Sequence, residues 1–137
     1  MYETVYQYWR LGGIDMESIL NSIKKLLGPG MEYDHFDPDI IMHINSAFSV
    51  LTQLGVGPAE GFFINDEAEK WEDFLPEEKM IHSVKTYIYL KVKLVFDPPL
   101  SSAVLESMKE QIKELEWRLP VAVESAKIES EEKIQNG

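Results

Sequence analysis

The chain has 137 residues, a formal net charge of −11 and no cysteine. This length fits a single domain. The absence of cysteine excludes disulfides, thiolate metal sites and cysteine nucleophiles, and suits a reducing cytosol or a particle held together without covalent links. The negative balance argues against a DNA-gripping protein and against anionic membranes. No apolar run approaches the roughly 20 residues that cross a bilayer, and the first residues lack the apolar core of a secretory signal.

Residues 1–15 differ in composition from the rest of the chain, being rich in aromatic residues: Tyr2, Tyr6, Tyr8 and Trp9. Two hypotheses stay open for this extension. It is a genuine arm that packs on a neighbour, or it is a start-site artefact with the true start at Met16. The second hypothesis follows from Leu11-Gly12-Gly13, which a purine-rich ribosome-binding sequence can encode.

Two helices are predicted in the first half. Asp15 can cap a helix that ends at Gly28. Its apolar face consists of Ile19, Leu20, Ile23, Leu26 and Leu27. Asp37-Pro38 is typical of a second helix start, with the carboxylate as the cap, and Gly55 closes that helix. Its broad apolar stripe consists of Ile40, Ile41, Ile44, Ala47, Phe48, Leu51 and Leu54.

The connecting segment 55–76 is rich in turn residues and then in acids. Eight acids fall between Ala59 and Glu78 against one base, Lys70: Glu60, Asp66, Glu67, Glu69, Glu72, Asp73, Glu77 and Glu78. The apolar trio 62–64 is either a small strand or a loop tip. A short helix is predicted where the spacing suits it, at Trp71, Phe74 and Leu75.

The stretch VKTYIYLKVKLVFDPP, residues 84–99, is ambiguous. From Ile88 it alternates as a half-buried strand does. A helical period of three and four nevertheless holds over a longer range, through Met80, Ile81, Val84, Ile88, Val92 and Val95. We therefore predict a helix that begins near Pro76 and ends at Asp97, before two prolines.

A last helix is predicted from Ser101 or Ser102, the candidate caps. Its short heptad seam consists of Leu105, Met108, Ile112, Leu115 and Leu119. Pro120 interrupts this pattern, and residues 120–137 are predicted to form a flexible tail. The expected fold is therefore all-α, a small bundle of about five helices over residues 16–119 with a long acidic connecting loop.

No catalytic motif is present, so the sequence predicts no enzyme, no cofactor and no metal site. A metal held by Asp39 and His43, with His35 or Asp37 nearby, is the weaker alternative to solvated surface residues. The acidic run 60–78 lacks the spacing of a calcium loop and is interpreted as a solvated face. Three aromatic residues suit the core or an interface better than base stacking: Tyr87, Tyr89 and Phe96. Either Trp117 or Arg118 faces a partner, or Trp117 completes the core.

Five short motifs occur in order along the chain, and their combination resembles that of a known protein family: HINS, QLGVGP, YIYLK, FDPP and EWRL. Over residues 16–119 the chain resembles small virion proteins of long-tailed phages that infect Gram-positive bacteria, described as head–tail connector, adaptor or DNA-packaging proteins. The resemblance implies a structural protein in the neck of the virion, assembled in the host cytoplasm. It implies a twelve-fold ring beneath the portal that extends the DNA channel, lets DNA pass without specific binding, and receives a tail-completion or stopper protein.

The resemblance also implies roles for two groups of residues. The portal-binding end would contain Glu114, Trp117, Arg118 and Leu119. A loop at the inner or lower face of the ring would contain Gly55, Val56, Gly57, Pro58, Phe62, Phe63 and Ile64. The acidic composition agrees with a channel that does not grip DNA, since each carboxylate opposes phosphate binding.

Two other functional classes remain as alternatives to a connector. A DNA-packaging accessory similar to a terminase small subunit would need a basic helix-turn-helix face, which a net charge of −11 disfavours. A helical protein-binding module of the bacterial host would be a stable monomer or dimer rather than a ring. An enzyme is the least favoured class.

Overall fold

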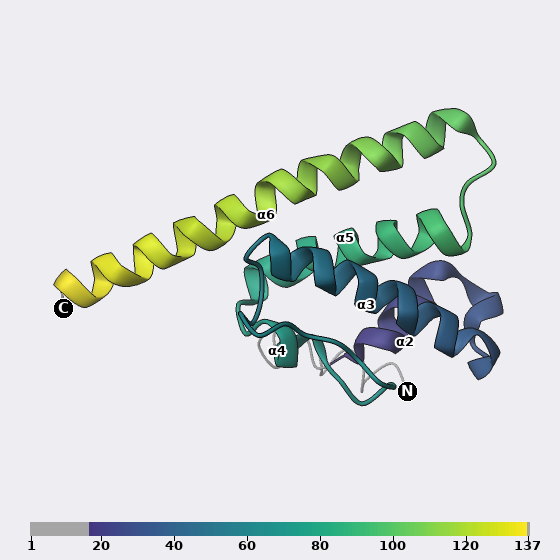
Figure 1. Cartoon of the computed structure of the whole chain (residues 1–137), viewed down its shortest axis with the longest axis horizontal. Coiled ribbons are helices and arrows are strands. Elements are labelled where there is room, and N and C mark those ends of the chain that lie inside the picture. Colours follow the sequence, from purple (N-terminus) through teal and green to yellow (C-terminus); the bar gives the residue numbers. More distant parts are fainter. Residues whose placement is uncertain (1–16, 137) are drawn as a thin grey trace, which may run out of the picture.

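The computed structural model describes residues 17–136, and every regular element in this range is a helix (Figure 1). The five α-helices are α2 (Ile19–Leu27), α3 (Asp37–Gln53), α4 (Trp71–Phe74), α5 (Glu78–Phe96) and α6 (Ser102–Asn136). Two short 3₁₀ turns, Pro29–Met31 and Asp34–Phe36, join α2 to α3. The predicted all-α class and number of helices are confirmed. Across residues 17–136, no helix is both long and apolar enough to span a membrane.

Helix α5 is the centre of the bundle, and α2, α3 and α6 all pack against it. It contains the stretch that alternates like a strand, so the prediction of a helix there is confirmed. The helical period explains the outcome, because it buries Ile81, Val84 and Ile88 together. A strand would instead have placed Val84 and Ile88 on one face and left their neighbour Tyr87, which is fully buried, on the other.

The helix boundaries differ from the prediction in their caps. Helix α2 is capped by Ser18, whose hydroxyl accepts a hydrogen bond from the Asn21 amide at 3.2 Å. The predicted cap, Asp15, lies outside the described residues. Asp37 is the first residue of α3 and not its cap, which is Phe36. At α6 the cap is Ser101, whose hydroxyl accepts from the Val104 amide at 3.4 Å.

The connecting segment between α3 and α5 covers one end of the core. The trio 62–64 is a loop and not a strand. The Phe62 ring lies against those of Phe48 and Phe74, with centroids 5.0 and 5.3 Å apart. Three of the acids have a local structural role, since their carboxylates accept backbone N–H bonds: Asp66, Glu69 and Asp73.

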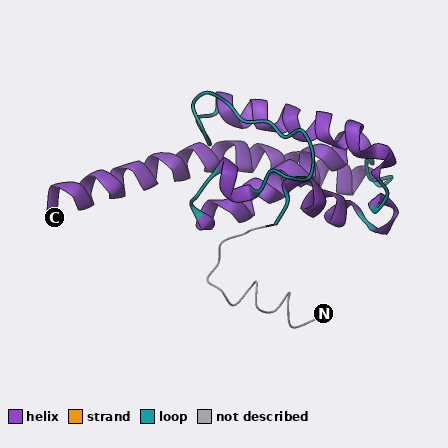
Figure 2. Ribbon diagram, turned by 90° about the horizontal axis from the view of Figure 1, so that it is seen from below, coloured by secondary structure: helices purple, strands orange, loops and turns teal. Residues whose placement is uncertain are grey.

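The helix that was expected to be interrupted at Pro120 continues through residues 121–136, which were predicted to form a flexible tail. Helix α6 continues through Pro120 to Asn136 and projects well beyond the rest of the molecule (Figures 1 and 2). Proline removes one backbone donor, but the turn that contains it is held by Leu119, which is 2% exposed, and by Ala122 and Val123, which pack against the core. The following residues are mostly strong helix formers, so the polar composition alone was misleading.

Candidate partner-binding surfaces

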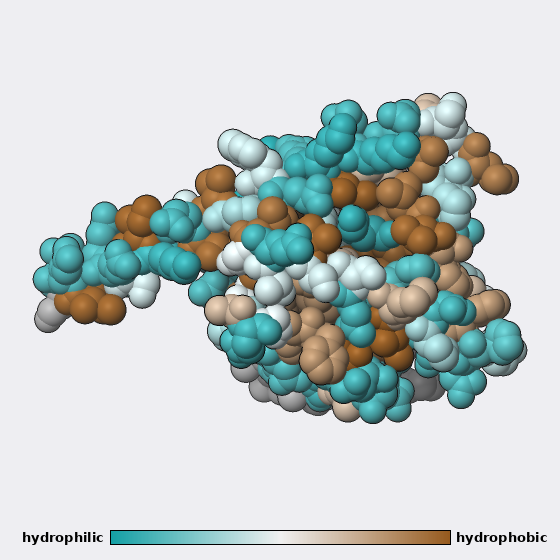
Figure 3. All heavy atoms as spheres, in the orientation of Figure 1, coloured by the Kyte–Doolittle hydropathy of each residue, from teal (hydrophilic) through white to brown (hydrophobic). Residues whose placement is uncertain are grey.

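The outward face of α6 exposes an apolar stripe in a region of mostly polar residues. Trp117, Val121 and Ile128 are 69%, 48% and 49% exposed. Their spacings of four and seven residues place them on one side of the helix, opposite the buried Leu119. Figure 3 shows apolar atoms interrupting the hydrophilic surface along the projecting part of α6. We call these three residues the outer stripe.

The four residues expected at a portal-binding end do not form one surface. Glu114 and Arg118 form an ion pair at 2.6 Å, and both side chains are more than half exposed. Trp117 lies beside them and is exposed, so the alternative in which it completes the core is wrong. Leu119 points the other way, into the core. Val121 and Ile128 were not predicted as surface contacts, although their spacing from Trp117 was the available signal.

On its inner side, α6 and the first turns of α5 border a groove of about 690 Å³. Its floor is apolar and includes Met80, Leu115, Leu119, Ala122 and Ala126. Its rim carries charges of both signs: Glu77, Glu78, Lys79, Arg118 and Glu129. The groove lies where α6 begins to project past the N-terminal end of α5, so α6 contributes to it more than α5 does.

The expected loop Gly55–Ile64 is fixed to the body of the molecule. The Asn45 side chain donates to the Ile64 carbonyl at 2.9 Å and accepts from the Ile64 amide at 2.8 Å. Gly57 has φ +88°, and a Cβ there would lie 2.3 Å from the Phe74 ring. Val56 and Ile64 are buried, whereas Phe63 is 64% exposed. The loop therefore exposes one large apolar side chain, that of Phe63, on a backbone that is fixed by the hydrogen bonds to Asn45.

A buried polar contact ties α5 to α6 behind the outer stripe. The Tyr87 hydroxyl donates to the Glu116 carboxylate at 2.8 Å. Burial raises the pKa of the Tyr87 phenol well above its usual value, and the adjacent Glu116 carboxylate raises it further. Tyr87 is therefore a neutral core residue, which confirms the expectation that it belongs to the core rather than to a base-stacking surface.

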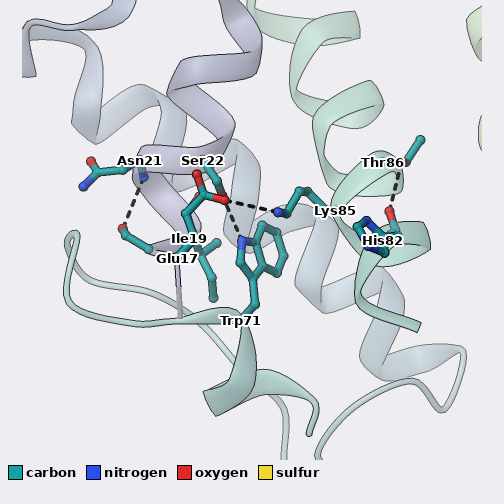
Figure 4. A network of polar contacts seen from close by, with 9 residues as sticks. Glu17, Ile19, Asn21, Ser22, Trp71, His82, Lys85 and Thr86 are labelled. Carbon is teal, nitrogen blue, oxygen red and sulfur yellow. Dashed lines mark hydrogen bonds and ion pairs between the residues drawn. The ribbon is translucent and has the colours of Figure 1, made fainter. Parts of the chain in front are cut away.

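A second polar network joins α2, α4 and α5 (Figure 4). The Trp71 indole N–H donates to the Ser22 hydroxyl at 2.8 Å, and Ser22 donates onward to the Ile19 carbonyl at 3.0 Å. The Lys85 ammonium lies 5.6 Å from the centroid of the Trp71 ring and 3.3 Å from the Glu17 carboxylate. The network fastens the acidic connecting segment to the bundle, so its function is structural.

The residues considered for a metal are engaged in different contacts. Asp37 forms an ion pair with Lys24 at 2.7 Å. The rings of His35 and His43 lie against Phe36 and Phe96, respectively. Over residues 17–136, no three His, Asp or Glu side chains converge as metal ligands would. The described residues thus offer surfaces for macromolecules more clearly than a site for chemistry.

One of three comparisons with known proteins gives a match. No curated protein and no solved structure matches the chain significantly. A family model described as phage connector protein matches residues 19–126. This range includes every helix of the bundle and the first part of the projecting segment of α6. The match confirms the family expected from the five sequence motifs. The chain belongs to the phage connector protein family.

Proposed function

We propose that this connector forms a ring beneath the portal, extends the DNA channel and joins the capsid to the tail. In this proposal it binds the portal on one side and a tail-completion or stopper protein on the other. It is a structural protein of the virion neck that assembles in the host cytoplasm. The observation that supports the proposal best is the outer stripe, an exposed apolar surface on a helix that projects from the bundle.

The outer stripe has the composition of a docking surface. Trp117 is a large, rigid side chain, and Arg118 beside it is held by Glu114 at 2.6 Å. Trp and Arg are enriched among the residues that dominate binding energies. We assign the portal contact to Glu114, Trp117 and Arg118, extended by Val121 and Ile128. Leu119 is removed from the direct contact because it is buried in the bundle.

The loop Gly55–Ile64 is proposed to lie at the inner or lower face of the ring. Its own residues carry only one charge, Glu60, and the segment that follows is strongly acidic. Carboxylates near a channel repel phosphates, so DNA passes without being held. This part of the proposal predicts no DNA binding even at low salt, which a gel shift measures.

The test mixes purified protein with the portal protein of the same phage, with electron microscopy and a quantitative binding measurement as readouts. Trp117→Ala is expected to weaken portal binding by at least about tenfold, as loss of a central aromatic contact does. The circular dichroism spectrum should not change, because Trp117 is exposed. Tyr33→Ala is the matched control, since Tyr33 is an exposed aromatic residue, 75% accessible, outside α6. Equal binding by both variants would remove the outer stripe from the portal contact.

A further inference from the structure

Helix α3 has an outward face without charge. No Asp, Glu, Lys or Arg occurs between Asp39 and Glu60, in a chain of which 27% of the residues are charged. The side of α3 that points away from the core exposes residues spaced by four, three and four: Met42, Ser46, Ser49 and Gln53. Met42 is 56% exposed. An exposed helix side normally carries charged residues, so this composition needs an explanation other than solvation.

The loop after α3 adds an exposed apolar side chain to this surface. It runs beside the helix, because Asn45 binds the Ile64 backbone twice and a Cβ on Gly61 would lie 3.9 Å from the Thr52 hydroxyl. Phe63, which is 64% exposed, is therefore held next to α3. We call the surface formed by Met42, Ser46, Ser49, Gln53 and Phe63 the α3 face.

A second surface with little charge lies at the turn between α5 and α6, where Asp97 is paired with Lys93 at 2.7 Å. No charged residue occurs between Asp97 and Glu106. Leu100 is completely exposed, at 105% of the reference area, and Val95 and Val104 are 61% and 49% exposed. Pro98 and Pro99 restrict the backbone before Leu100, so docking of this side chain costs little conformational entropy. We call Val95, Leu100 and Val104 the turn patch.

Net charge limits where two copies of this chain can touch. Each copy carries −11, so a contact between surfaces of average composition brings like charges together, and such pairs are destabilising. The α3 face and the turn patch avoid this repulsion on both sides of the contact. Charged residues are also depleted at the centres of protein interfaces, where Met and Phe, the residue types of Met42 and Phe63 in the α3 face, are enriched.

The two surfaces are different from each other, which matters for the kind of assembly. An interface between two different patches of one chain is heterologous, and its repetition closes a ring when the rotation allows. We infer that the turn patch of one copy, with Leu100 at its centre, docks on the α3 face of the next copy. This inference rests on the proposed ring, and it names the two surfaces that build it.

The experiment uses two variants of the full chain. Leu100→Glu places a charge in the turn patch, and Ser46→Glu places one in the α3 face. Each variant alone is expected to lose self-association at least tenfold, measured by analytical ultracentrifugation and on the portal by electron microscopy. Mixed together they retain one intact interface, because the turn patch of the Ser46→Glu chain fits the α3 face of the Leu100→Glu chain. The mixture is therefore expected to form a 1:1 dimer that does not grow further.

Matched controls separate this contact from a general effect of added charge. Ser130→Glu adds the same charge at an exposed serine of α6 far from the turn patch, and Ile134→Glu does so at an apolar residue that is 78% exposed. Both controls should assemble as the wild type does. The inference would be overturned if the mixed variants stayed monomeric, or if the controls lost assembly as strongly as the two variants. It would also be overturned if wild-type chains showed no contact with one another on the portal.

Cross-linking provides a readout for weak association, because the chain has no cysteine of its own. Leu100→Cys and Ser49→Cys chains, mixed and treated with a short bis-maleimide, should give a mixed dimer. Leu100→Cys mixed with Glu110→Cys should not. Attachment of single subunits to the portal is measured in parallel. If Ser46→Glu abolishes that attachment and leaves self-association unchanged, the α3 face binds the portal, and the inference is wrong while the connector function stands.

Discussion

The Tyr87 hydroxyl lies 2.8 Å from the Glu116 carboxylate and donates a hydrogen bond across the interface of α5 and α6. Glu116 is one residue before Trp117 of the outer stripe. The contact therefore fixes the rotation of α6 on the bundle, and with it the direction in which the outer stripe faces. This links a polar contact between two helices to the orientation of a proposed binding surface.

Tyr87→Phe is expected to lower the free energy of unfolding by about 1.5–3 kcal/mol at pH 7, since it removes one hydrogen bond to a charged acceptor. The folded state raises the pKa of Tyr87, so its stabilising effect is complete below the unfolded pKa of about 10. Above that pH the unfolded phenol ionises and the folded one does not, so the wild type loses stability. Urea unfolding from pH 7 to 11 should show the difference between wild type and variant shrinking above about pH 10. A constant difference would contradict this assignment.

Ser22→Ala tests the attachment of the acidic segment to α2. The Trp71 indole N–H is buried and donates to the Ser22 hydroxyl at 2.8 Å. Without this acceptor, we expect a loss of about 1–3 kcal/mol in the free energy of unfolding, because a buried donor is left unsatisfied. Ser49→Ala is the control, since Ser49 is an exposed serine in α3 and should change stability very little. Equal effects of the two substitutions would show that the indole finds another partner.

Gly57→Ala and Gly55→Ala form a matched pair. Both glycines have positive φ, +88° and +81°, so alanine is strained at both by about 1 kcal/mol. At Gly57 a Cβ would also lie 2.3 Å from the Phe74 ring, whereas nothing lies within 4 Å of a Cβ at Gly55. Gly57→Ala should therefore cost about 1–3 kcal/mol more than Gly55→Ala, the usual cost of overpacking. Thermal unfolding of the two variants measures this difference directly.

The local pattern of apolar residues predicted the helices well, because each helix buries a stripe with its own period. The stretch 84–96 shows this most clearly, since its helical period extends further than its alternation. Leu119 was also predictable as a core residue from its place in the heptad seam with Leu115 and Ile112. The resemblance placed it at a binding end, and the structure places it inside.

What the sequence did not predict depends on contacts between distant residues or on a competition between local effects. Asn45 and Ile64 are 19 residues apart, and Ser22 and Trp71 are 49 apart, so no local pattern reveals these hydrogen bonds. The continuation of α6 past Pro120 was not predicted, because one proline and a polar composition were given more weight than the helix propensity of the residues. Helices tolerate a proline when packing holds the turn around it, and packing is a property of the whole fold.

Helix α6 continues well past Ala122 and Val123, which pack against the core. Residues 124–136 extend for about 20 Å at the usual helical rise, so a bend of about 20° in this part of the helix would move its tip by roughly 7 Å. The bundle core would not need to rearrange for such a movement. In the proposed assembly, one subunit could thus reach binding positions on the portal that differ in height or angle.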